Sequence, residues 1–561
     1  MARQSETTKI GFLMSGVIAA GHPHTAQAGA QILQQGGNAV DAAVAATFAS
    51  FVAEASLVNI GGGGIAQLYD PHSGQATVYD FFSAMPGLAK NGSRPDKLDF
   101  RQVSIDFGAA QQAFYIGRAS VAVPGVVAGL CTLMEEAGTL PLTTVLQPAI
   151  RLARNGVIMS DVPAYITSLL EPILTDTPGI AAIFAPTGTL VKAGDRVVFH
   201  QLADTLETLS QQGADLFYTG AVAQAILADQ QANGGLLTET DLAGYRVLRS
   251  TPIEIAYRGH TILLPPPSSS GGPLIAFALK LLSAYALDSV AHNSFEHLQI
   301  LAEVMRLANL ARAEWEAEPV QAANGHGLKH SDSLLADKNV AHYQQQLNLA
   351  LAGRQRQVEP KLRQGPSNTT HISVADSQGM VISITTSAGE SAGFVVGETG
   401  VILNNMLGEI DLHPGGFHQL PPGHRLQTMM TPTLVLHQGE PILALGSGGS
   451  NRIRTAILQT MSNIIDFKTN LAEAVAASRL HYEDGQMQLE GGIAPEVADQ
   501  LEAAGYKVNR WNARNMFFGG THAVAHPGDG HHRQAPWIAV GDPRRGGSVA
   551  MAKTPTKDHR G

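Results

Sequence analysis

The spacing of apolar positions along this chain changes near residue 369. Between residues 140 and 345, apolar residues recur at i, i+3 and i+4, which is typical of amphipathic helices. The expected helices cover 145–155, 203–212, 221–229, 274–284 and 294–314. From residue 369 onward apolar and polar residues alternate, which indicates half-buried strands. These strands are expected at 371–375, 380–386, 401–403, 433–437 and 441–445, and helices return at 453–464 and 471–477.

Other elements are expected on either side of the helical region. Thr25 is a candidate cap for a helix over 26–35, and a pair of glycines follows that helix. Asn38 or Asp41 then opens a second, alanine-rich helix. Two further strands are expected at 245–255 and 261–264.

The segment around residue 369 has the pattern of a β-hairpin that begins with a threonine. Asp376-Ser377-Gln378-Gly379 has turn chemistry, and a polar, poorly periodic stretch at about 352–368 precedes the hairpin. A threonine hydroxyl is a weak nucleophile until a base lies beside it, and cleavage before the threonine makes its own α-amino group that base. The pattern fits such a cleavage, but Thr369-Thr370-His371 alone would also suit an ordinary strand.

Composition limits the classes of partner. The chain has 561 residues, of which 44% are hydrophobic and 15% charged, so it can bury a large core. A formal net charge of −10 argues against nucleic-acid and anionic-membrane partners, which require clustered Lys and Arg. Cys131 is the only cysteine, which excludes a disulfide within the chain and a thiolate metal site. His22, His24, His531 and His532 lack a partnering ligand cluster, so neither a metal nor a cofactor is expected.

The N-terminal region lacks the features of a signal peptide. Arg3 and Lys9 flank a polar stretch, and the apolar residues 11–20 lack the usual n-region and cleavage site. No run reaches about 18 apolar residues, the length that a membrane-spanning helix requires. A cytoplasmic location is therefore expected.

From about residue 16 to about 550 the chain resembles the γ-glutamyltranspeptidase family of N-terminal-nucleophile hydrolases. The motifs that carry the resemblance, in order, are 36–43, 59–64, 123–129, 237–245, 265–272, 369–371, 397–405, 430–433, 446–453, 519–524 and 542–547. The resemblance implies an α+β fold, a four-layer αββα sandwich. It also implies a large subunit, 1–368, and a small subunit, 369–561, which intertwine as a heterodimer of the two cleavage products. The higher oligomeric state is left open.

The resemblance further implies a nucleophile and its neighbour. Cleavage between Asn368 and Thr369 would free Thr369, and Thr370 is the competing nucleophile. Ser387, with Thr386 as the alternative, aligns with a hydroxyl that hydrogen-bonds the family nucleophile.

An oxyanion hole is expected in the turn Gly448-Gly449-Ser450. The resemblance places Gly449 and Ser450 in the two donor positions, with Ser450 in place of a glycine of the family. Backbone N–H groups in such a turn can approach a developing oxyanion closely.

The expected substrate pocket departs from the family pattern. Phe82 stands where similar enzymes have an arginine for the substrate α-carboxylate, and Met406 and Glu409 replace a glutamine and the aspartate that binds the α-ammonium group. Thr428 and Met429 replace two serines. An apolar pocket of this kind would suit an acyl group without a zwitterionic end.

Charged residues nearby leave a second interpretation open. Arg118 or Arg425 could bind a distal carboxylate. Alternatively, Glu409 or Glu390 could contact the ammonium group and Arg118 the carboxylate, which would restore γ-glutamyl recognition by another route.

These observations predict a self-processing amide hydrolase or acyltransferase that acts on a small-molecule amide through an acyl-enzyme. The resemblance implies γ-glutamyl transfer or glutathione hydrolysis. The pocket substitutions favour the alternative, an amidase for another acyl group, similar to cephalosporin (glutaryl) acylases or oxamate amidohydrolases. A third hypothesis is a non-catalytic binding module, which predicts neither self-cleavage nor turnover.

Overall fold

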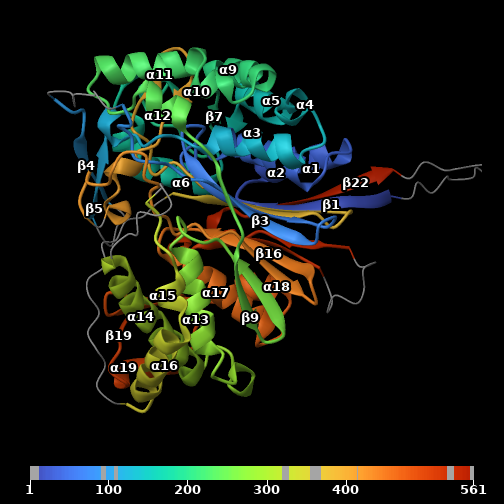
Figure 1. The fold of residues 1–561 in the computed structure, drawn as a ribbon, viewed down its shortest axis with the longest axis vertical. Coiled ribbons are helices and arrows are strands. Elements are labelled where there is room, and N and C mark those ends of the chain that lie inside the picture. Colours follow the sequence, from blue (N-terminus) through green and yellow to red (C-terminus); the bar gives the residue numbers. More distant parts are fainter. Residues whose placement is uncertain are drawn as a thin grey trace, which may run out of the picture.

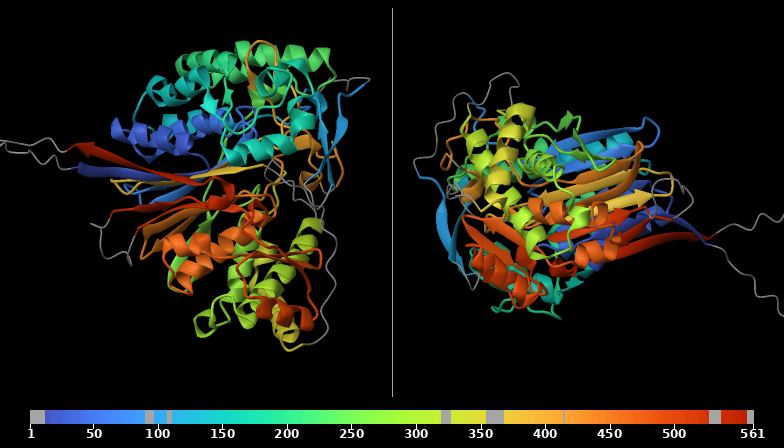
Figure 2. Two further views of the ribbon diagram at one scale, coloured as in Figure 1. Left: turned by 180° about the vertical axis from the view of Figure 1, so that it is seen from behind. Right: turned by 90° about the horizontal axis from the view of Figure 1, so that it is seen from below.

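Two β-sheets pack face to face, and helices cover the outer side of each (Figure 1; Figure 2). The structure, a computed structural model, describes residues 12–89, 97–106, 111–318, 327–353, 368–413, 415–526 and 536–555. The layers follow the order helix, sheet, sheet, helix. This architecture confirms the predicted α+β fold and its four-layer αββα sandwich.

The seven-stranded sheet holds the predicted hairpin near its middle. Its strands, in spatial order, are β22 (Ser548–Pro555), β1 (Phe12–Ala20), β11 (Thr370–Asp376), β12 (Val381–Ser387), β2 (Gly63–Asp70), β3 (Gln75–Phe81) and β8 (Leu248–Ser250). All neighbouring pairs are antiparallel, and Thr370 lies opposite Thr386 in the β11–β12 register. The hairpin is therefore fixed on both sides by strands from the N-terminal part of the chain.

The six-stranded sheet brings a glycine-rich turn toward the start of this hairpin. Its strands, in spatial order, are β21 (Ile538–Val540), β20 (Gly520–Ala525), β16 (Glu440–Gly448), β15 (Thr433–His437), β10 (His260–Leu264) and β9 (Ile253–Tyr257). Small and branched side chains such as Val17, Ala375, Leu434 and Ala444 pack between the sheets. Because β16 ends at Gly448, the turn that follows it lies beside the first residues of β11.

Helices from different parts of the chain cover the two sheets. The helices over the seven-stranded sheet are α1 (Pro23–Gln34), α2 (Ala39–Ala53), α3 (Val126–Ala137), α4 (Leu142–Val145), α5 (Gln147–Asn155), α6 (Asp161–Leu169), α7 (Glu171–Leu174), α8 (Pro178–Phe184), α9 (His200–Gln212), α10 (Asp215–Tyr218), α11 (Ala221–Ala232) and α12 (Glu239–Gly244). The helices of the other layer are α13 (Gly271–Leu282), α14 (Phe295–Ala317), α15 (Asp332–Leu335), α16 (Asp337–Leu351), α17 (Arg452–Ile465), α18 (Leu471–Ala476) and α19 (Pro495–Ala503). None of the described helices combines the length and apolarity that crossing a bilayer requires.

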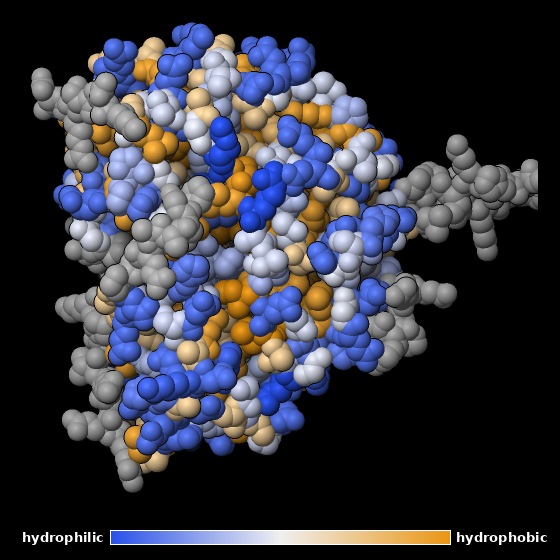
Figure 3. Space-filling model, viewed as in Figure 1, coloured by the Kyte–Doolittle hydropathy of each residue, from blue (hydrophilic) through white to orange (hydrophobic). Residues whose placement is uncertain are grey.

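Short strands complete the fold outside the two main sheets. They are β4 (Arg101–Asp106) with β5 (Gln111–Ile116), β6 (Val157–Ile158) with β7 (Arg196–Val197), β13 (Val395–Val396) with β14 (Val401–Ile402), and the group β17 (Leu480–Glu483), β18 (Gln486–Leu489) and β19 (Lys507–Arg510). On the face shown in Figure 3, hydrophilic residues cover much of the surface and apolar patches lie mainly toward the middle. A mixed surface of this kind is ordinary for a folded domain.

The predicted strand at 245–255 was wrong as a single element. It divides into β8, in the seven-stranded sheet, and β9, in the six-stranded sheet. Pro252 lies between the two strands. Proline has no N–H for a strand ladder, so the chain can leave one sheet there and enter the other.

The predicted cap of the first helix was also wrong. His22 is the N-cap of α1, and its Nδ1 accepts a hydrogen bond from the His24 N–H. Thr25 lies inside the helix, where its hydroxyl donates to Glu54 Oε1 at 2.6 Å. The next helix begins after Asn38, the first of the two predicted starts, which forms a capping box with Asp41.

Candidate active site

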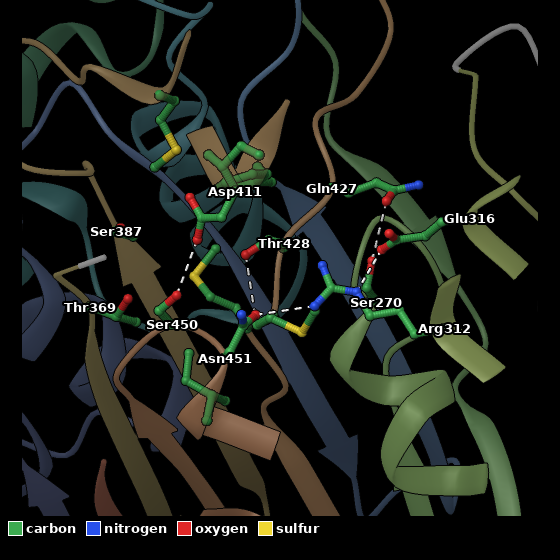
Figure 4. Close-up of a pocket in the computed structure, with 16 residues that line it drawn as sticks. Ser270, Arg312, Glu316, Thr369, Ser387, Asp411, Gln427, Thr428, Ser450 and Asn451 are labelled. Atoms are coloured by element: carbon green, nitrogen blue, oxygen red, sulfur yellow. Dashed lines mark hydrogen bonds and ion pairs between the residues drawn. The ribbon is translucent and has the colours of Figure 1, made fainter. Parts of the chain in front are cut away.

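Thr369 lies directly before β11, a central strand of the seven-stranded sheet. Its side chain lines a pocket at that end of the strand. The residue is 2% exposed, so almost all of its surface is covered by protein. The side chains that line the pocket are those of Phe82, Ser270, Arg312, Glu316, Thr369, Ser387, Met406, Asp411, Leu412, Gln427, Thr428, Met429, Met430, Ser450, Asn451 and Ile453 (Figure 4). The cavity between them has a volume of about 30 Å³, which is room for water.

A hydroxyl group contacts the carbonyl of the peptide bond that precedes Thr369. Ser387, the last residue of β12, donates its Oγ–H to the Asn368 carbonyl oxygen at 2.6 Å. The Asn368 side chain donates to Glu390 Oε2 and to the Ser56 carbonyl. The Asn368–Thr369 bond is thus held in a defined geometry, with a hydrogen-bond donor on the oxygen that would become negative if Thr369 attacked.

Thr370, the alternative nucleophile, and Thr386, the alternative to Ser387, lie in different hydrogen-bond environments from Thr369 and Ser387. Thr370 donates its Oγ1–H to Glu54 Oε2 at 2.6 Å, and burial raises the pKa of the Glu54 carboxyl. Thr386 Oγ1 is buried without a hydrogen-bond partner in the part of the chain that the structure describes. Neither side chain lines the pocket, whereas Thr369 and Ser387 both do.

His371, the third residue of the Thr-Thr-His motif, lies in the core. Its Nδ1 is 2.8 Å from Thr385 Oγ1 and its Nε2 is 2.9 Å from Ser373 Oγ. Burial lowers the pKa of the ring well below its usual value, so the imidazole is neutral. Its contacts give it a structural role, as a hydrogen-bonded group inside the sandwich.

The turn after β16 has the geometry that a close approach to Thr369 requires. A Cβ atom at Gly448 would lie 2.2 Å from the Thr369 carbonyl oxygen, so only glycine fits there. Gly449 has φ +124°, and Ser450 has φ +51°, a conformation that non-glycine residues rarely adopt. Within the described residues, no acceptor takes the N–H group of Gly449 or Ser450. Two backbone donors are therefore free beside Thr369.

Arg545, in the short helical turn after Asp542, lies against this glycine turn. A Cβ atom at Gly449 would be 3.2 Å from Arg545 Nη2. The side-chain atoms Nε and Nη1 of Arg545 have no hydrogen-bond partner among the described residues. Burial, together with the nearby Arg452, lowers the pKa of Arg545 to about 10, and Glu390 opposes the shift. The guanidinium group therefore packs against the turn that approaches the Thr369 carbonyl oxygen.

Three carboxyl groups are buried in this region, and of these only Asp411 lines the pocket. Burial raises the pKa of Glu390 to about 8, against the opposing effect of Arg545. Burial, and then the charges of Asp411 and Glu390, raise the pKa of Glu409 well above its usual value. Burial also raises the pKa of Asp411 to about 6, although the Ser450 hydroxyl donates to it at 3.1 Å.

The structure brings together most of the residues predicted to contact substrate. Phe82, Met406, Thr428 and Met429 all line the pocket. Glu390 and Glu409 are buried behind it and are not among the residues that line it.

The two predicted arginines lie elsewhere. Arg118 pairs with Asp229 at 3.0 Å and stacks on the Phe394 ring. Arg425 is buried, and it donates to the Tyr245 hydroxyl at 2.6 Å and to the Phe82 carbonyl. Both guanidinium groups are occupied by protein partners, and neither lines the pocket.

Sequence reasoning missed three charged residues of the site, Arg312, Asp411 and Arg545. A signal existed for Arg312, since this residue falls on the apolar stripe of α14 that also includes Ala308, Ala311 and Trp315. A charge on an apolar helix face needs a partner or a function.

Comparisons with known proteins agree with this geometry. A family model described as gamma-glutamyltranspeptidase matches residues 25–552. The chain belongs to the gamma-glutamyltranspeptidase family. It is similar to the acylase ACY 1 proenzyme of Pseudomonas sp. (strain SE83), with 36% identity over 94% of this chain and 93% of that protein. It is also similar to the glutathione hydrolase proenzyme of Escherichia coli (strain K12), with 34% identity over 88% and 86%.

A solved structure confirms the fold of this family member. The cephalosporin acylase from Bacillus halodurans superposes with a TM-score of 0.80 at 24% identity, covering 98% of each chain. The predicted fold and family, N-terminal-nucleophile hydrolases of the gamma-glutamyltranspeptidase type, are thus confirmed, as is the prediction of an enzyme that acts on amide bonds.

No cluster of three or more His, Cys, Asp or Glu side chains suited to a metal ion occurs in the described ranges. His531 and His532, considered in the sequence, lie outside those ranges, as do Arg3, Lys9 and most of the polar stretch before Asn368.

Proposed function

We propose that this chain cleaves itself between Asn368 and Thr369 and then hydrolyses amides through an acyl-enzyme on Thr369. The observation that carries the proposal is the 2.6 Å hydrogen bond from Ser387 to the Asn368 carbonyl, beside a buried Thr369. The peptide bond lies in the site as a first substrate would. The proenzyme relatives from Pseudomonas and Escherichia coli support the proposal.

Self-cleavage follows from these contacts in two steps. Thr369 Oγ1 attacks the Asn368 carbonyl carbon, and the oxygen that becomes negative is already bound by Ser387. The proton of the Thr369 hydroxyl is transferred to the amide nitrogen as the C–N bond breaks, which leaves an ester on Thr369 Oγ1 and a free α-amino group. Water hydrolyses the ester and releases the Asn368 carboxylate, and the new amino group can serve as the base in later cycles.

Turnover of an external amide would use the same groups. Thr369 attacks the substrate carbonyl, and the N–H groups of Gly449 and Ser450 are the proposed donors to the oxyanion, since no acceptor takes them among the described residues. The amine leaves with a proton, and water resolves the acyl-enzyme. The small-molecule substrate and the heterodimer of fragments 1–368 and 369–561 are parts of this proposal.

The acyl group proposed first is one without an α-amino-acid end. Phe82, Met406 and Met429 form apolar walls in the pocket, at the positions where γ-glutamyl enzymes are expected to have polar partners. Losing a charge-assisted hydrogen bond costs about 1.5–3 kcal/mol, so a zwitterionic head would bind poorly against these walls. The acylase relative supports this assignment.

A γ-glutamyl group is the second candidate. Glu316 and Asp411 both line the pocket, and an ammonium group could pair with either. The glutathione hydrolase relative supports this assignment.

The two candidates are separated by comparing γ-glutamyl-p-nitroanilide with glutaryl-p-nitroanilide on the cleaved enzyme. We expect the higher kcat/KM for the glutaryl compound. A strong preference for the γ-glutamyl compound would replace the first candidate with the second. The cytoplasmic location stays a prediction.

A further inference from the structure

Arg312 is a pocket residue that neither the catalytic steps nor the predicted substrate contacts use. It comes from α14, in the helical layer outside the six-stranded sheet, and is 7% exposed. Figure 4 shows Arg312 and Thr369 on opposite sides of the pocket. A guanidinium group is thus available at the end of the pocket that lies away from the nucleophile.

The protein partners of Arg312 occupy two of its three guanidinium nitrogens. Its Nε donates to Glu316 Oε1 at 2.7 Å, and its Nη1 donates to Asn451 Oδ1 at 3.3 Å. Its Nη2 has no acceptor within the described ranges. Nη2 is not fully buried and is therefore accessible from the pocket, where a ligand anion can accept its N–H groups.

The surroundings of Arg312 suit one end of a small acyl group. Ser270, Gln427 and Thr428 add neutral polar groups on its side of the pocket. The apolar residues of the pocket, Phe82 and Met429 among them, offer walls for methylene groups between the two ends. A molecule with a carbonyl at one end, a short alkyl chain and an anionic group at the other matches this lining.

We propose that Arg312 binds the terminal carboxylate of a dicarboxylic acyl group, the glutaryl and γ-glutamyl groups being the two sources of that carboxylate. The proposal rests on the proposed function, because it places the amide carbonyl of the same substrate at Thr369. A planar guanidinium can bind a carboxylate through two parallel hydrogen bonds, which an ammonium cannot do. Arg312 thereby supplies, from α14, the positive charge that is missing at the position of Phe82, which follows β3.

Glu316 distinguishes the two sources. Its carboxylate lies beside Arg312, at 2.7 Å from Nε, and would be the nearest partner for the ammonium group of a γ-glutamyl substrate. A glutaryl group has no ammonium, so Glu316 would only compete with it for the guanidinium.

The test compares three p-nitroanilides, glutaryl, γ-glutamyl and the uncharged pentanoyl, on the cleaved enzyme and its variants. For Arg312→Gln we expect kcat/KM for at least one carboxylate-bearing compound to fall roughly 10- to 100-fold relative to pentanoyl. Arg312→Lys should recover part of that loss. An unchanged ratio, or an equal loss on all three compounds, overturns the assignment of Arg312 while leaving Thr369 chemistry intact.

Glu316→Gln identifies the source. If kcat/KM falls for the γ-glutamyl compound alone, the natural acyl group is a γ-glutamyl group. If kcat/KM rises for the glutaryl compound, the natural acyl group is of the glutaryl type. A loss for all compounds, matching that of Arg312→Gln, would mean that the pair is structural and would overturn the proposal.

Binding of glutarate and of glutamate, measured by calorimetry, separates this proposal from the proposed function. Weaker binding to Arg312→Gln than to the unsubstituted protein supports the carboxylate site even if no anilide is hydrolysed. Absence of binding to the unsubstituted protein contradicts it. Failure of self-cleavage and of all turnover contradicts the proposed function instead.

Discussion

Ser387 and Thr386 are adjacent residues with different hydrogen-bond environments. Ser387 donates to the Asn368 carbonyl, whereas Thr386 Oγ1 has no partner among the described residues. We therefore expect Ser387→Ala to slow self-cleavage roughly 100- to 1,000-fold, because the developing oxyanion loses its donor. The matched control is Thr386→Val, which should cleave at a nearly normal rate. Time courses by denaturing gel measure both, and equal slowing in the two variants would argue against this role of Ser387.

A pH dependence of stability follows from Glu390. Its folded-state pKa is about 8, above the ordinary value of 4.5, because burial favours the neutral carboxyl. The unfolded chain therefore releases this proton first, and the contribution of Glu390 to stability declines as pH rises from about 4.5 to about 8. Both proteins are studied in the uncut Thr369→Ala background. Between pH 5 and pH 8, we expect the free energy of unfolding to fall less in the Glu390→Gln variant than in the protein that keeps Glu390. Urea unfolding at both pH values measures this, and parallel losses would contradict the assignment.

Several site residues could be predicted from the sequence because they lie in short, recognisable motifs. The hairpin pattern and the family resemblance identified Thr369, Ser387 and the 448–450 turn, all of which the structure brings together. Arg118 and Arg425 were candidate ligands on charge alone, and only the fold shows that Asp229 and the Phe82 backbone occupy them. Pairing across distant segments cannot be read from spacing.

The turn between β16 and α17 is the element on which the site depends most. Gly448→Ala would place a methyl group 2.2 Å from the Thr369 carbonyl oxygen, which requires the turn or the hairpin to move. We expect this variant to lose self-cleavage, or to fold poorly, with a cost of about 1–3 kcal/mol in the free energy of unfolding, as at other overpacked core sites.

The control for that prediction is Gly244→Ala at the end of α12. A Cβ atom there has its nearest neighbour, a Leu88 methyl group, at 3.6 Å, an ordinary contact. It should cleave and unfold like the unsubstituted chain. Normal cleavage in Gly448→Ala, followed by intact mass, would show that the close approach is not needed.

The prediction of helices and strands succeeded where one apolar pattern corresponds to one element. The strand at 433–437 and the helix at 453–464 match β15 and α17 closely. The segment 245–255 failed because its apolar residues serve two different sheets on either side of Pro252. A one-dimensional pattern does not specify which sheet a strand joins.

At the scale of the whole molecule, the two predicted subunits share both sheets. β11 and β12 of the small subunit lie between β1 and β2 of the large one, and β10 of the large subunit pairs with β15 of the small one, with β9 on its other side. We expect the fragments to stay associated after cleavage, because separation would expose strand edges and the core between the sheets. Native mass measurement should show one complex that divides only in denaturant. Two free fragments in native buffer would contradict this description.

The self-cleavage of the chain is the central claim, and intact mass under denaturing conditions tests it most directly. The freshly purified protein should give two species corresponding to residues 1–368 and 369–561, while Thr369→Ala should remain one chain and Thr370→Ala should still cleave. A single uncut chain after long incubation, or cleavage that persists in Thr369→Ala, would contradict the account.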